Sequence, residues 1–431
     1  MTGWPALAPF RTRSFRYQWP ADLGTAWALE MEMIILGWYV LVESGSVGLL
    51  TLFGALLYVG TLLSPLMGTL GDRMGLRRVL AAMRLSYALL AGVILALAAT
   101  GRLEPTLVLV AAFLVGLIKP TDIGMRTALV SASVPSSQLV AAMGISRTTQ
   151  DSARIGGALA GAGFMASLGM VSAYVVITAL YLVCAVLTMK SGAPRRERVA
   201  GAAQRSAVPF GAAVAPSPAA ASPSSPWRDL KEGLQHVWFA PQLRAAMMLA
   251  ALVNLCAFPL SGGLMPYIAR DVFQLDQQGL GWLVASYAGG ALMGSVILSA
   301  IGARLRPART MLLTCVIWQL CLLGLAWPVS VGVAMGLFMA AGLHQSLSMI
   351  SLSIILLRTS EARFRGRVMG ARMLAIYTLP VGLLVAGALI PIIGFRALVG
   401  VYVGSSLLMT AAIAWVWRRE LLPRQARANT R

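Results

Sequence analysis

The sequence contains few charged residues, and acidic residues are the scarcest of them. Charged side chains make up 12% of its 431 residues, whereas soluble globular domains usually carry about 25%. Only 15 residues are Asp or Glu, against 35 Lys or Arg, and there are 2 His. With so little charge and 58% hydrophobic residues, the chain cannot present the solvated surface of an ordinary soluble protein.

The sequence also offers little from which a metal centre or a catalytic site could be built. Its 4 cysteines, Cys184, Cys256, Cys315 and Cys321, lie in apolar segments without metal-ligand spacing, which indicates small core residues. No Walker-type G-x-x-x-x-G-K-[ST] loop and no nucleophile constellation occurs. We therefore expect a protein that is not an enzyme and that uses no cofactor or metal.

What the sequence has instead is a succession of apolar runs of about 20 residues, each long enough to cross a bilayer as a helix. These runs predict an all-α membrane protein with twelve transmembrane helices in two six-helix bundles. The first six helices are expected at 22–42, with Asp22 as the N-cap, and at 47–67, 79–99, 105–126, 139–166 and 170–189. The other six are expected at 243–268, 278–300, 309–327, 331–357, 367–392 and 395–417.

The composition changes between these two sets of helices. Residues 191–226 are rich in Ala, Pro and Ser and cannot bury an apolar face, so they predict a flexible linker. Residues 227–238 then predict a short amphipathic helix at the membrane surface. The expected division is an N-terminal six-helix bundle (1–190), a cytoplasmic linker with the amphipathic helix (191–242) and a C-terminal six-helix bundle with its tail (243–431).

The net charge of +20 could suggest binding to nucleic acid, but its distribution argues against such a partner. Most Lys and Arg residues fall in one set of loops and in the tails, while Arg102, Arg270 and Arg396 fall in the other set. This asymmetry follows the positive-inside rule. It predicts a multi-pass protein of the plasma (bacterial inner) membrane with both termini in the cytoplasm, where the basic rim meets anionic headgroups of the lipid bilayer.

A charged turn, GTLGDRMGLRRVL from Gly68 to Leu80, joins the second and third apolar runs. The plain interpretation is a basic cytoplasmic turn, which explains the arginines but not the acid or the glycines at this spacing. The pattern resembles the loop signature of the major facilitator superfamily at all seven fixed positions. The residues that carry the resemblance as a gating motif are Gly68, Asp72, Arg73, Gly75, Arg77 and Arg78.

This resemblance implies two repeated six-helix halves that rock about a site near the middle of the membrane. It also implies that Asp72 helps to hold an inner gate shut against the start of the eleventh helix. Here that helix begins with Arg365-Gly366-Arg367, so the Asp72 carboxylate could use both an arginine and a helix N-terminus. The resemblance further implies a small-molecule substrate, with protons as a second partner, and we expect a monomer.

Charged residues within the apolar runs cost about 2.5–3.5 kcal/mol each at the bilayer centre and therefore need partners or a wet cavity. The first half contains several, among them Glu30, Glu32, Lys119, Asp122, Arg126, Arg147, Asp151 and Arg154. Four acids balance four bases, which predicts an ion-pair network that either binds substrate or protons or only locks the helices together. Glu30 and Glu32 lie about 200° apart on a helix, so one would face a cavity and the other a neighbouring helix.

The second half has no acid in its predicted spans. His344 shares a helix face with Ser348 and Ser351, and we consider it a candidate substrate- or proton-binding residue. The plainer interpretation is a hydrogen-bonded core histidine. In the first half, Arg84 is expected to extend to the membrane interface with its head group in water.

The stretch RIGGALAGAG from Arg154 to Gly163 resembles the glycine-rich motif on the fifth helix of superfamily exporters. It has Gly157 where that motif usually has proline, and Ala160 where it has glycine. With residues 135–154, it loosely resembles the branch of macrolide and siderophore exporters.

The sequence thus predicts a proton-coupled exporter of small amphipathic compounds. The alternatives are an importer or facilitator of a small polar or anionic metabolite, bound by Lys119, Arg147 and Arg154, and a non-transporting receptor or lipid-handling protein.

Overall fold

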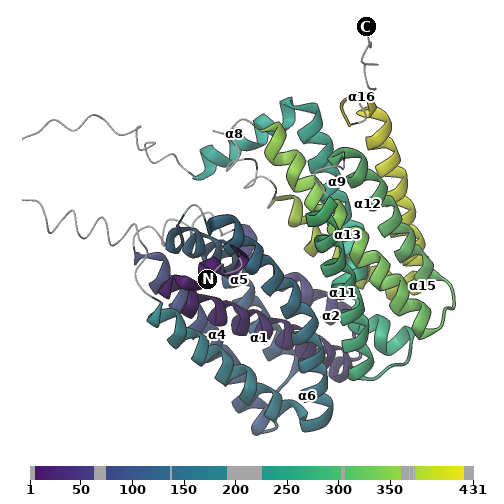
Figure 1. Ribbon diagram of the computed structural model, residues 1–431. Helices are drawn as coiled ribbons and strands as arrows, with labels where there is room; N and C mark the ends of the chain where they lie inside the picture. Colours follow the sequence, from purple (N-terminus) through teal and green to yellow (C-terminus); the bar gives the residue numbers. More distant parts are fainter. Residues whose placement is uncertain are drawn as a thin grey trace, which may run out of the picture.

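The computed structural model describes residues 5–62, 74–135, 138–191, 226–301, 306–360, 368, 372 and 374–421. Within these ranges the chain is built of helices and short connections, with no strand. We call the described part up to residue 191 the first half and the part from residue 226 the second half. Figure 1 shows the two halves as separate groups of long helices, purple to blue and teal to yellow.

The first half contains five α-helices and two short 3₁₀ helices in its described ranges. In chain order they are η1 (Pro5–Arg11), α1 (Arg13–Ser44), α2 (Val47–Leu56), η2 (Val59–Leu62), α4 (Leu76–Ala99), α5 (Pro105–Ser133) and α6 (Leu139–Lys190). Gly75 of the charged turn has φ 87°, a conformation that favours glycine, and precedes the first residue of α4. The second expected span, 47–67, corresponds to α2 and η2 as far as residue 62. Its last residues, 63–67, lie outside the described ranges.

The second half begins with the short helix that the sequence predicts before its first span. Its helices are α8 (Pro226–Phe239), α9 (Pro241–Phe258), η4 (Pro259–Gly263), α10 (Met265–Tyr267), η5 (Ile268–Val272), α11 (Gln277–Ile301), α12 (Pro307–Leu323), η7 (Gly324–Ala326), α13 (Val331–Thr359), α15 (Thr378–Val416) and α16 (Arg418–Leu421). Both η4 and η5 are π-helical turns. The expected seventh span is therefore interrupted where Pro259 and Pro266 break the α-helical hydrogen-bond ladder.

Two long helices fold back on themselves. Gly169 in α6 has φ 76° and Gly394 in α15 has φ 79°, and each glycine separates two helical segments. The sequence predicts these same breaks between its fifth and sixth and its eleventh and twelfth spans. In the described ranges 9 helices are long and apolar enough to cross a membrane, the two folded-back helices among them. This arrangement is consistent with the twelve predicted spans.

The start of the first helix differs from the prediction. Asp22 is not an N-cap: α1 begins nine residues earlier, at Arg13, with Thr12 in extended conformation before it. The segment before Asp22 carries Phe15 and Gln18, whose side chains are 1% and 0% exposed. Burial against α5 and α6 therefore extends the helix through Pro20, where the local sequence indicated a boundary.

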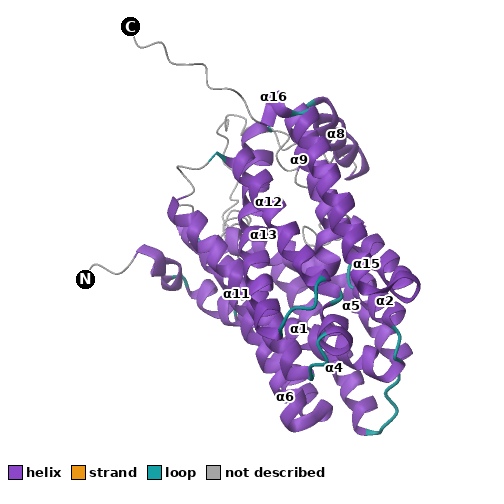
Figure 2. Cartoon of the chain, turned by 90° about the vertical axis from the view of Figure 1, so that its right-hand side faces the viewer, coloured by secondary structure: helices purple, strands orange, loops and turns teal. Residues whose placement is uncertain are grey.

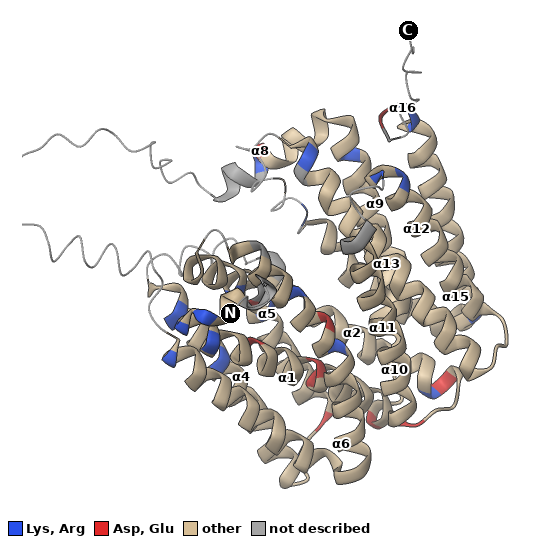
Figure 3. Cartoon of the chain, in the orientation of Figure 1, with Lys and Arg blue, Asp and Glu red and all other residues tan. Residues whose placement is uncertain are grey.

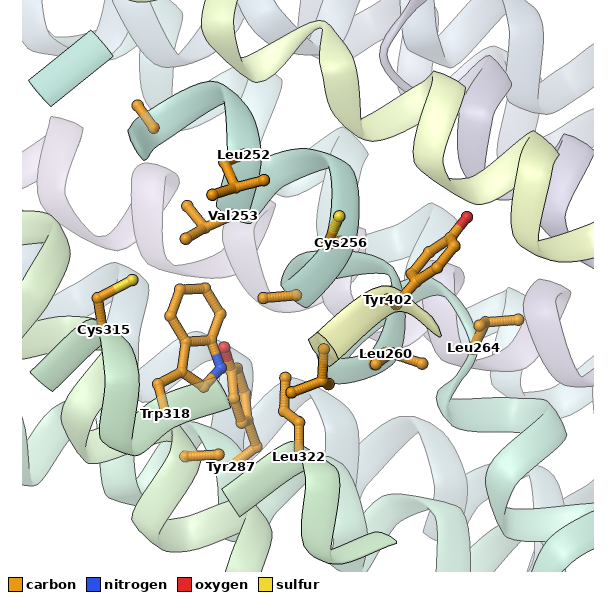
Figure 4. Packing of buried hydrophobic residues seen from close by; sticks show 14 of the residues in the cluster. Leu252, Val253, Cys256, Leu260, Leu264, Tyr287, Cys315, Trp318, Leu322 and Tyr402 are labelled. Carbon is orange, nitrogen blue, oxygen red and sulfur yellow. The ribbon is translucent and has the colours of Figure 1, made fainter. Parts of the chain in front are cut away.

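Each half has its own hydrophobic core. The core of the second half gathers around Trp318, which is fully buried and meets Phe258 edge-on at a ring-centroid distance of 5.0 Å. Figure 4 shows side chains from several helices converging on this tryptophan. Cys256 and Cys315 lie in the same core and Cys184 is buried in the first half, as expected for small core residues.

Basic residues gather at one end of the molecule, which we call the basic end. It carries α8, the start of α4 and the start of α12. Apart from one on α16, the acidic residues visible in Figure 3 lie in the interior of the first half and at the opposite end. Figure 2 shows α16 and α8 at the same end of the helices. This distribution agrees with the charge asymmetry of the sequence.

The two halves touch near the end opposite the basic end. A Cβ added at Gly281 would lie 2.7 Å from Cβ of Ala162, and one at Gly54 would lie 3.1 Å from Leu383. The guanidinium of Arg270 also reaches the carbonyl of Leu41 across the same contact. From there the helices of the two halves diverge toward the basic end (Figure 1).

Candidate functional site

An ion pair in the middle of the first half lies where that half faces the second. Arg154 Nε of α6 lies 3.7 Å from Glu30 Oε1 of α1, and the two side chains are 48% and 20% exposed. Tyr287 of α11, in the second half, lies close to Arg154. Both Glu30 and Arg154 are well inside their helices, so this is a pair at membrane depth that remains accessible from the space between the halves.

The glycine-rich stretch of α6 lets α1 approach closely enough to form this pair. A Cβ at Gly157 would lie 2.8 Å from Glu30 Cβ, and a Cβ at Gly161 would lie 2.8 Å from the Met31 Cα. A Cβ at Gly156 would meet the indole of Trp27 at 2.6 Å. Small residues here therefore permit tight packing of α1 against α6.

Glu32 points away from Glu30, into the interior of the first half. Its carboxylate accepts a hydrogen bond of 3.0 Å from the Tyr181 hydroxyl and one of 3.4 Å from the Tyr174 hydroxyl. Glu32 is 7% exposed. The two glutamates thus face different ways, as helical geometry predicts.

Lys119 of α5 lies between these two acids. It interacts electrostatically with Glu30, Glu32 and Arg154, and its Nζ lies 4.0 Å from Met33 Sδ. Glu32 and Lys119 both line a small cavity of about 20 Å³ whose other walls are apolar. Those walls are formed by Leu29, Met33, Leu36, Phe53, Leu57, Ala111, Ala112 and Val115. The cavity combines an acid and an amine with an apolar lining, and its volume is enough for about one water molecule.

A second cluster of charged side chains lies nearer the basic end. The sequence analysis placed two of its four members, Asp122 and Arg126, in the predicted ion-pair network. Arg84 of α4 pairs with Asp22 of α1 and also donates to the Thr188 hydroxyl. Arg126 pairs with Asp122 on α5 and contacts the Asp22 carbonyl oxygen at 3.5 Å. These side chains join α1, α4, α5 and α6.

The prediction that Arg84 extends to the membrane interface is wrong. Its side chain is 0% exposed, because Asp22 and Thr188 provide oxygen acceptors inside the bundle. The interpretation of Asp22 as a helix cap left Arg84 without a partner. Ten residues, or about 15 Å at 1.5 Å per residue, separate Asp22 from Glu32 on α1. This spacing alone places Asp22 at the edge of a span about 30 Å long, so it gave no sign of the burial of Asp22.

The remaining predicted residues lie apart from the central pair. Arg147 Nε is 3.2 Å from Asp151 Oδ2 on the same helix, with Arg147 56% exposed and Asp151 5% exposed. His344 lies in the second half, where its Nδ1 is 2.8 Å from the Ala340 carbonyl of its own helix. The structure does not bring His344 to the charges of the first half, and its role remains a prediction.

The gating motif is described only in part. Gly68, Asp72 and Arg73 lie outside the described residues, as does the segment 365–367. Of the remaining members, Arg78 is exposed and Arg77 donates a 3.0 Å hydrogen bond to the Ser191 carbonyl at the end of α6. This bond joins the start of α4 to the end of the first half. The expected contact between Asp72 and the eleventh helix stays a prediction.

Comparison with known proteins identifies relatives of this chain. A stretch of 169 residues is 28% identical to "Multidrug efflux pump Tap" of Mycobacterium tuberculosis (strain ATCC 25618 / H37Rv), covering 39% of this chain and 40% of that protein. The same figures hold for the protein of that name from Mycobacterium bovis (strain BCG / Pasteur 1173P2). The aligned stretch thus spans well under half of these curated relatives.

Solved structures match over nearly the whole chain. The nucleoside transporter NupG has a TM-score of 0.65 at 14% identity, covering 94% of this chain and 99% of that one. A D-xylose-proton symporter gives 0.65 at 12% identity, covering 93% and 96%. A POT family transporter in complex with 5-aminolevulinic acid gives 0.68 at 10% identity, covering 95% and 97%. At these identities the likeness shows the fold.

The Major Facilitator Superfamily matches residues 23–258 and 247–431. Together with the helical architecture and the structural likenesses, this match confirms the resemblance that the charged turn predicted. The chain belongs to the major facilitator superfamily, and it is a membrane transporter rather than an enzyme.

Proposed function

We propose that this transporter is a proton-coupled exporter of small amphipathic compounds that works by alternating access, with both termini and the basic end in the cytoplasm of a bacterial inner membrane. The observation that carries the proposal is the placement of Glu30 and Glu32. One acid faces the space between the halves and the other is buried behind it, with Lys119 between them. Acids at membrane depth are candidate sites for protons.

In this mechanism Glu30 and Arg154 form the part of the site that meets substrate. Their pair is open enough to exchange a partner, since both side chains are partly exposed. A cationic group on the substrate would compete with Arg154 for Glu30. The apolar side chains that line the neighbouring small cavity would move apart to contact the hydrophobic portion of the same molecule.

Glu32 and Lys119 form the part that responds to protons. When Glu32 takes up a proton, Lys119 loses one of the negative charges that stabilise its ammonium. The ammonium then interacts more strongly with Glu30 and weakens the Glu30–Arg154 pair. Proton binding at Glu32 and substrate binding at Glu30 are thereby coupled through one lysine, without direct contact between the ligands.

Export is favoured by the similarity to Tap, whose name describes multidrug efflux. A second candidate is an importer or facilitator of a small polar or anionic metabolite. It is supported by the exposure of Arg147 and Arg154 and by fold relatives that include a nucleoside transporter and a D-xylose-proton symporter. A monomer is sufficient for either function, because the site lies within one chain.

The test is a transport screen with the reconstituted full chain across amphipathic cations, nucleosides, sugars and anionic metabolites, with and without an imposed proton gradient. The proposal expects gradient-dependent movement of amphipathic compounds, and lower accumulation of the same compounds in cells that express the protein. Gradient-independent movement of a polar or anionic metabolite, with accumulation inside cells, would support the second candidate instead.

A further inference from the structure

Polar side chains form a column inside the first half, from the charged group near the basic end to Glu32. Its members come from all four long helices of that half and each is at most 9% exposed. They are Gln18, Asp22, Arg84, Tyr87, Asp122, Arg126, Tyr181 and Glu32. A column of this composition is unexpected in the interior of a helical bundle at membrane depth, where polar groups are costly.

Neighbouring members of the column are close enough to interact with one another. Tyr181 donates to Glu32 at 3.0 Å, and its ring centroid is 5.4 Å from that of Tyr87. Asp122 and Arg126 lie close enough to Tyr87 for their charges to act on its hydroxyl. Arg126 contacts the Asp22 carbonyl, and the Gln18 amide lies 3.4 Å from the Arg126 carbonyl. The column thus spans the distance from Gln18 to Glu32 along α1.

Five buried atoms spaced along this column have no hydrogen-bond partner among the described residues. They are Gln18 Oε1, Arg84 Nε, Tyr87 Oη, Asp122 Oδ1 and Arg126 Nε. An unpaired buried polar atom costs about 1–3 kcal/mol, and native proteins satisfy nearly all such atoms with protein groups or ordered water. Atoms that can bind water therefore occur near the basic end, in the middle of the column and close to Tyr181.

From these observations we infer that the column is a hydrated proton route inside the first half, which connects the basic end with Glu32. The inference rests on the proposed proton coupling and adds a path to it. Protons move along hydrogen-bonded water, tyrosine hydroxyl and carboxylate groups, each of which passes one proton on and returns to its starting state. The substrate, in contrast, meets Glu30 in the space between the halves.

The charges around the two possible paths favour the column. A proton that approached Glu32 from the space between the halves would pass Arg154 and Lys119, two cations in succession, and like charges repel strongly where the dielectric constant is low. Within the column Asp22 neutralises Arg84 and Asp122 neutralises Arg126. Of the described groups that face Glu32 itself, α6 contributes Tyr174 and Tyr181, and α5 contributes Lys119.

Cysteine labelling tests the hydration of the column without any substrate. In a background with the four native cysteines replaced by alanine, Tyr87→Cys is compared with Ala91→Cys. Ala91 lies one turn further on α4 and, like Tyr87, is buried in the hydrophobic core of the first half, but it is not a member of the column. With 2-aminoethyl methanethiosulfonate, the cysteine at position 87 should react at least about tenfold faster than the cysteine at position 91. A tenfold ratio corresponds to a free-energy difference of about 1.4 kcal/mol. Equal rates would show a dry column and overturn the inference.

Transport by Tyr87→Phe tests whether the route carries protons. In proteoliposomes the proton-gradient-driven flux of a fluorescent amphipathic cation should fall about tenfold, the effect of one lost hydrogen-bonded link, while counterflow exchange at equal pH stays within about twofold. The matched control is Tyr39→Phe, since Tyr39 bonds the Leu103 carbonyl in the same half, away from the column.

The outcomes separate this inference from the proposed function. A wild-type flux that ignores the gradient refutes the proposed proton coupling, and the route with it. A wild type that couples, together with a Tyr87→Phe variant that couples equally well, refutes the route alone. Loss of counterflow as well as driven flux in Tyr87→Phe would indicate a structural role for the hydroxyl and also contradict the route.

Discussion

The guanidinium of Arg270 donates a 2.9 Å hydrogen bond to the carbonyl oxygen of Leu41, near the C-terminus of α1. Arg270 lies in η5 of the second half, so this bond joins the two halves at the end opposite the basic end. The positive side chain meets the negative end of the α1 dipole. Arg270 is one of the three basic residues that do not follow the charge asymmetry of the sequence, and this contact gives the reason.

The first prediction concerns this contact. Arg270→Gln should shift the molecule toward a state open at that end, because a hydrogen bond to a charged group contributes about 1.5–3 kcal/mol, or about tenfold or more in population. Distances between spin labels at Glu104 and Asp276, both in the connections at that end, would report the shift. Arg396→Gln is the control, since Arg396 is exposed at the same end. Unchanged distance distributions in Arg270→Gln would contradict the role.

The second prediction concerns the buried pair of Arg84 and Asp22. Arg84→Gln should lower the free energy of unfolding by about 3–5 kcal/mol, because it leaves the Asp22 carboxylate buried and unpaired. Thermal melting of the purified chain would measure the loss. Arg102→Gln, at an exposed position, should change it by less than about 0.5 kcal/mol. A small effect at Arg84 would restore the idea of an arginine that extends to the interface.

The third prediction concerns the close approach of α1 and α6. Gly161→Ala would place Cβ 2.8 Å from Met31 Cα, a backbone atom, and should destabilise the protein by about 1–3 kcal/mol through overpacking. Gly163→Ala has open space around it and should be neutral or stabilising by up to about 1 kcal/mol. The two melting temperatures should therefore move in different directions. Equal shifts would mean that the helices are not packed through these glycines.

Much of the architecture could be predicted from the sequence because it depends on local patterns. Apolar runs of membrane length indicated the order of the helices, and Gly169 and Gly394 lie at the two breaks within long helices. The glycine of the charged turn that is described, Gly75, has the positive φ that its position required. Helix ends were harder, since burial of Phe15 and Gln18 decides where α1 begins.

The candidate site was predictable in its residues but less so in its partners. Glu30 and Glu32 were separated correctly because helical geometry sets their directions. The partner of Arg84 could not be found by spacing, because Asp22 lies 62 positions away on another helix. Tyr174 and Tyr181 were missed for the same reason: an aromatic residue in an apolar run gives no local sign that its hydroxyl meets a buried acid.

The fourth prediction separates the roles of the two glutamates. Glu30→Gln should weaken substrate binding, since it removes the charge that a cationic substrate would meet, and should leave proton movement by the occupied transporter in place. Glu32→Gln should allow counterflow exchange of substrate but abolish coupling to protons. Binding and counterflow measurements on the two variants would show these separate effects. Identical defects in both would contradict the division of labour.

The central claim is that substrate and protons move in a coupled cycle through this one chain. The direct measurement is the internal pH of proteoliposomes during addition of an amphipathic substrate, for the wild type and for Glu30→Gln/Glu32→Gln. We predict a substrate-dependent pH change with the wild type and none with the double variant. A pH change of the same size in both would contradict the account, as would substrate transport by the wild type with no pH change.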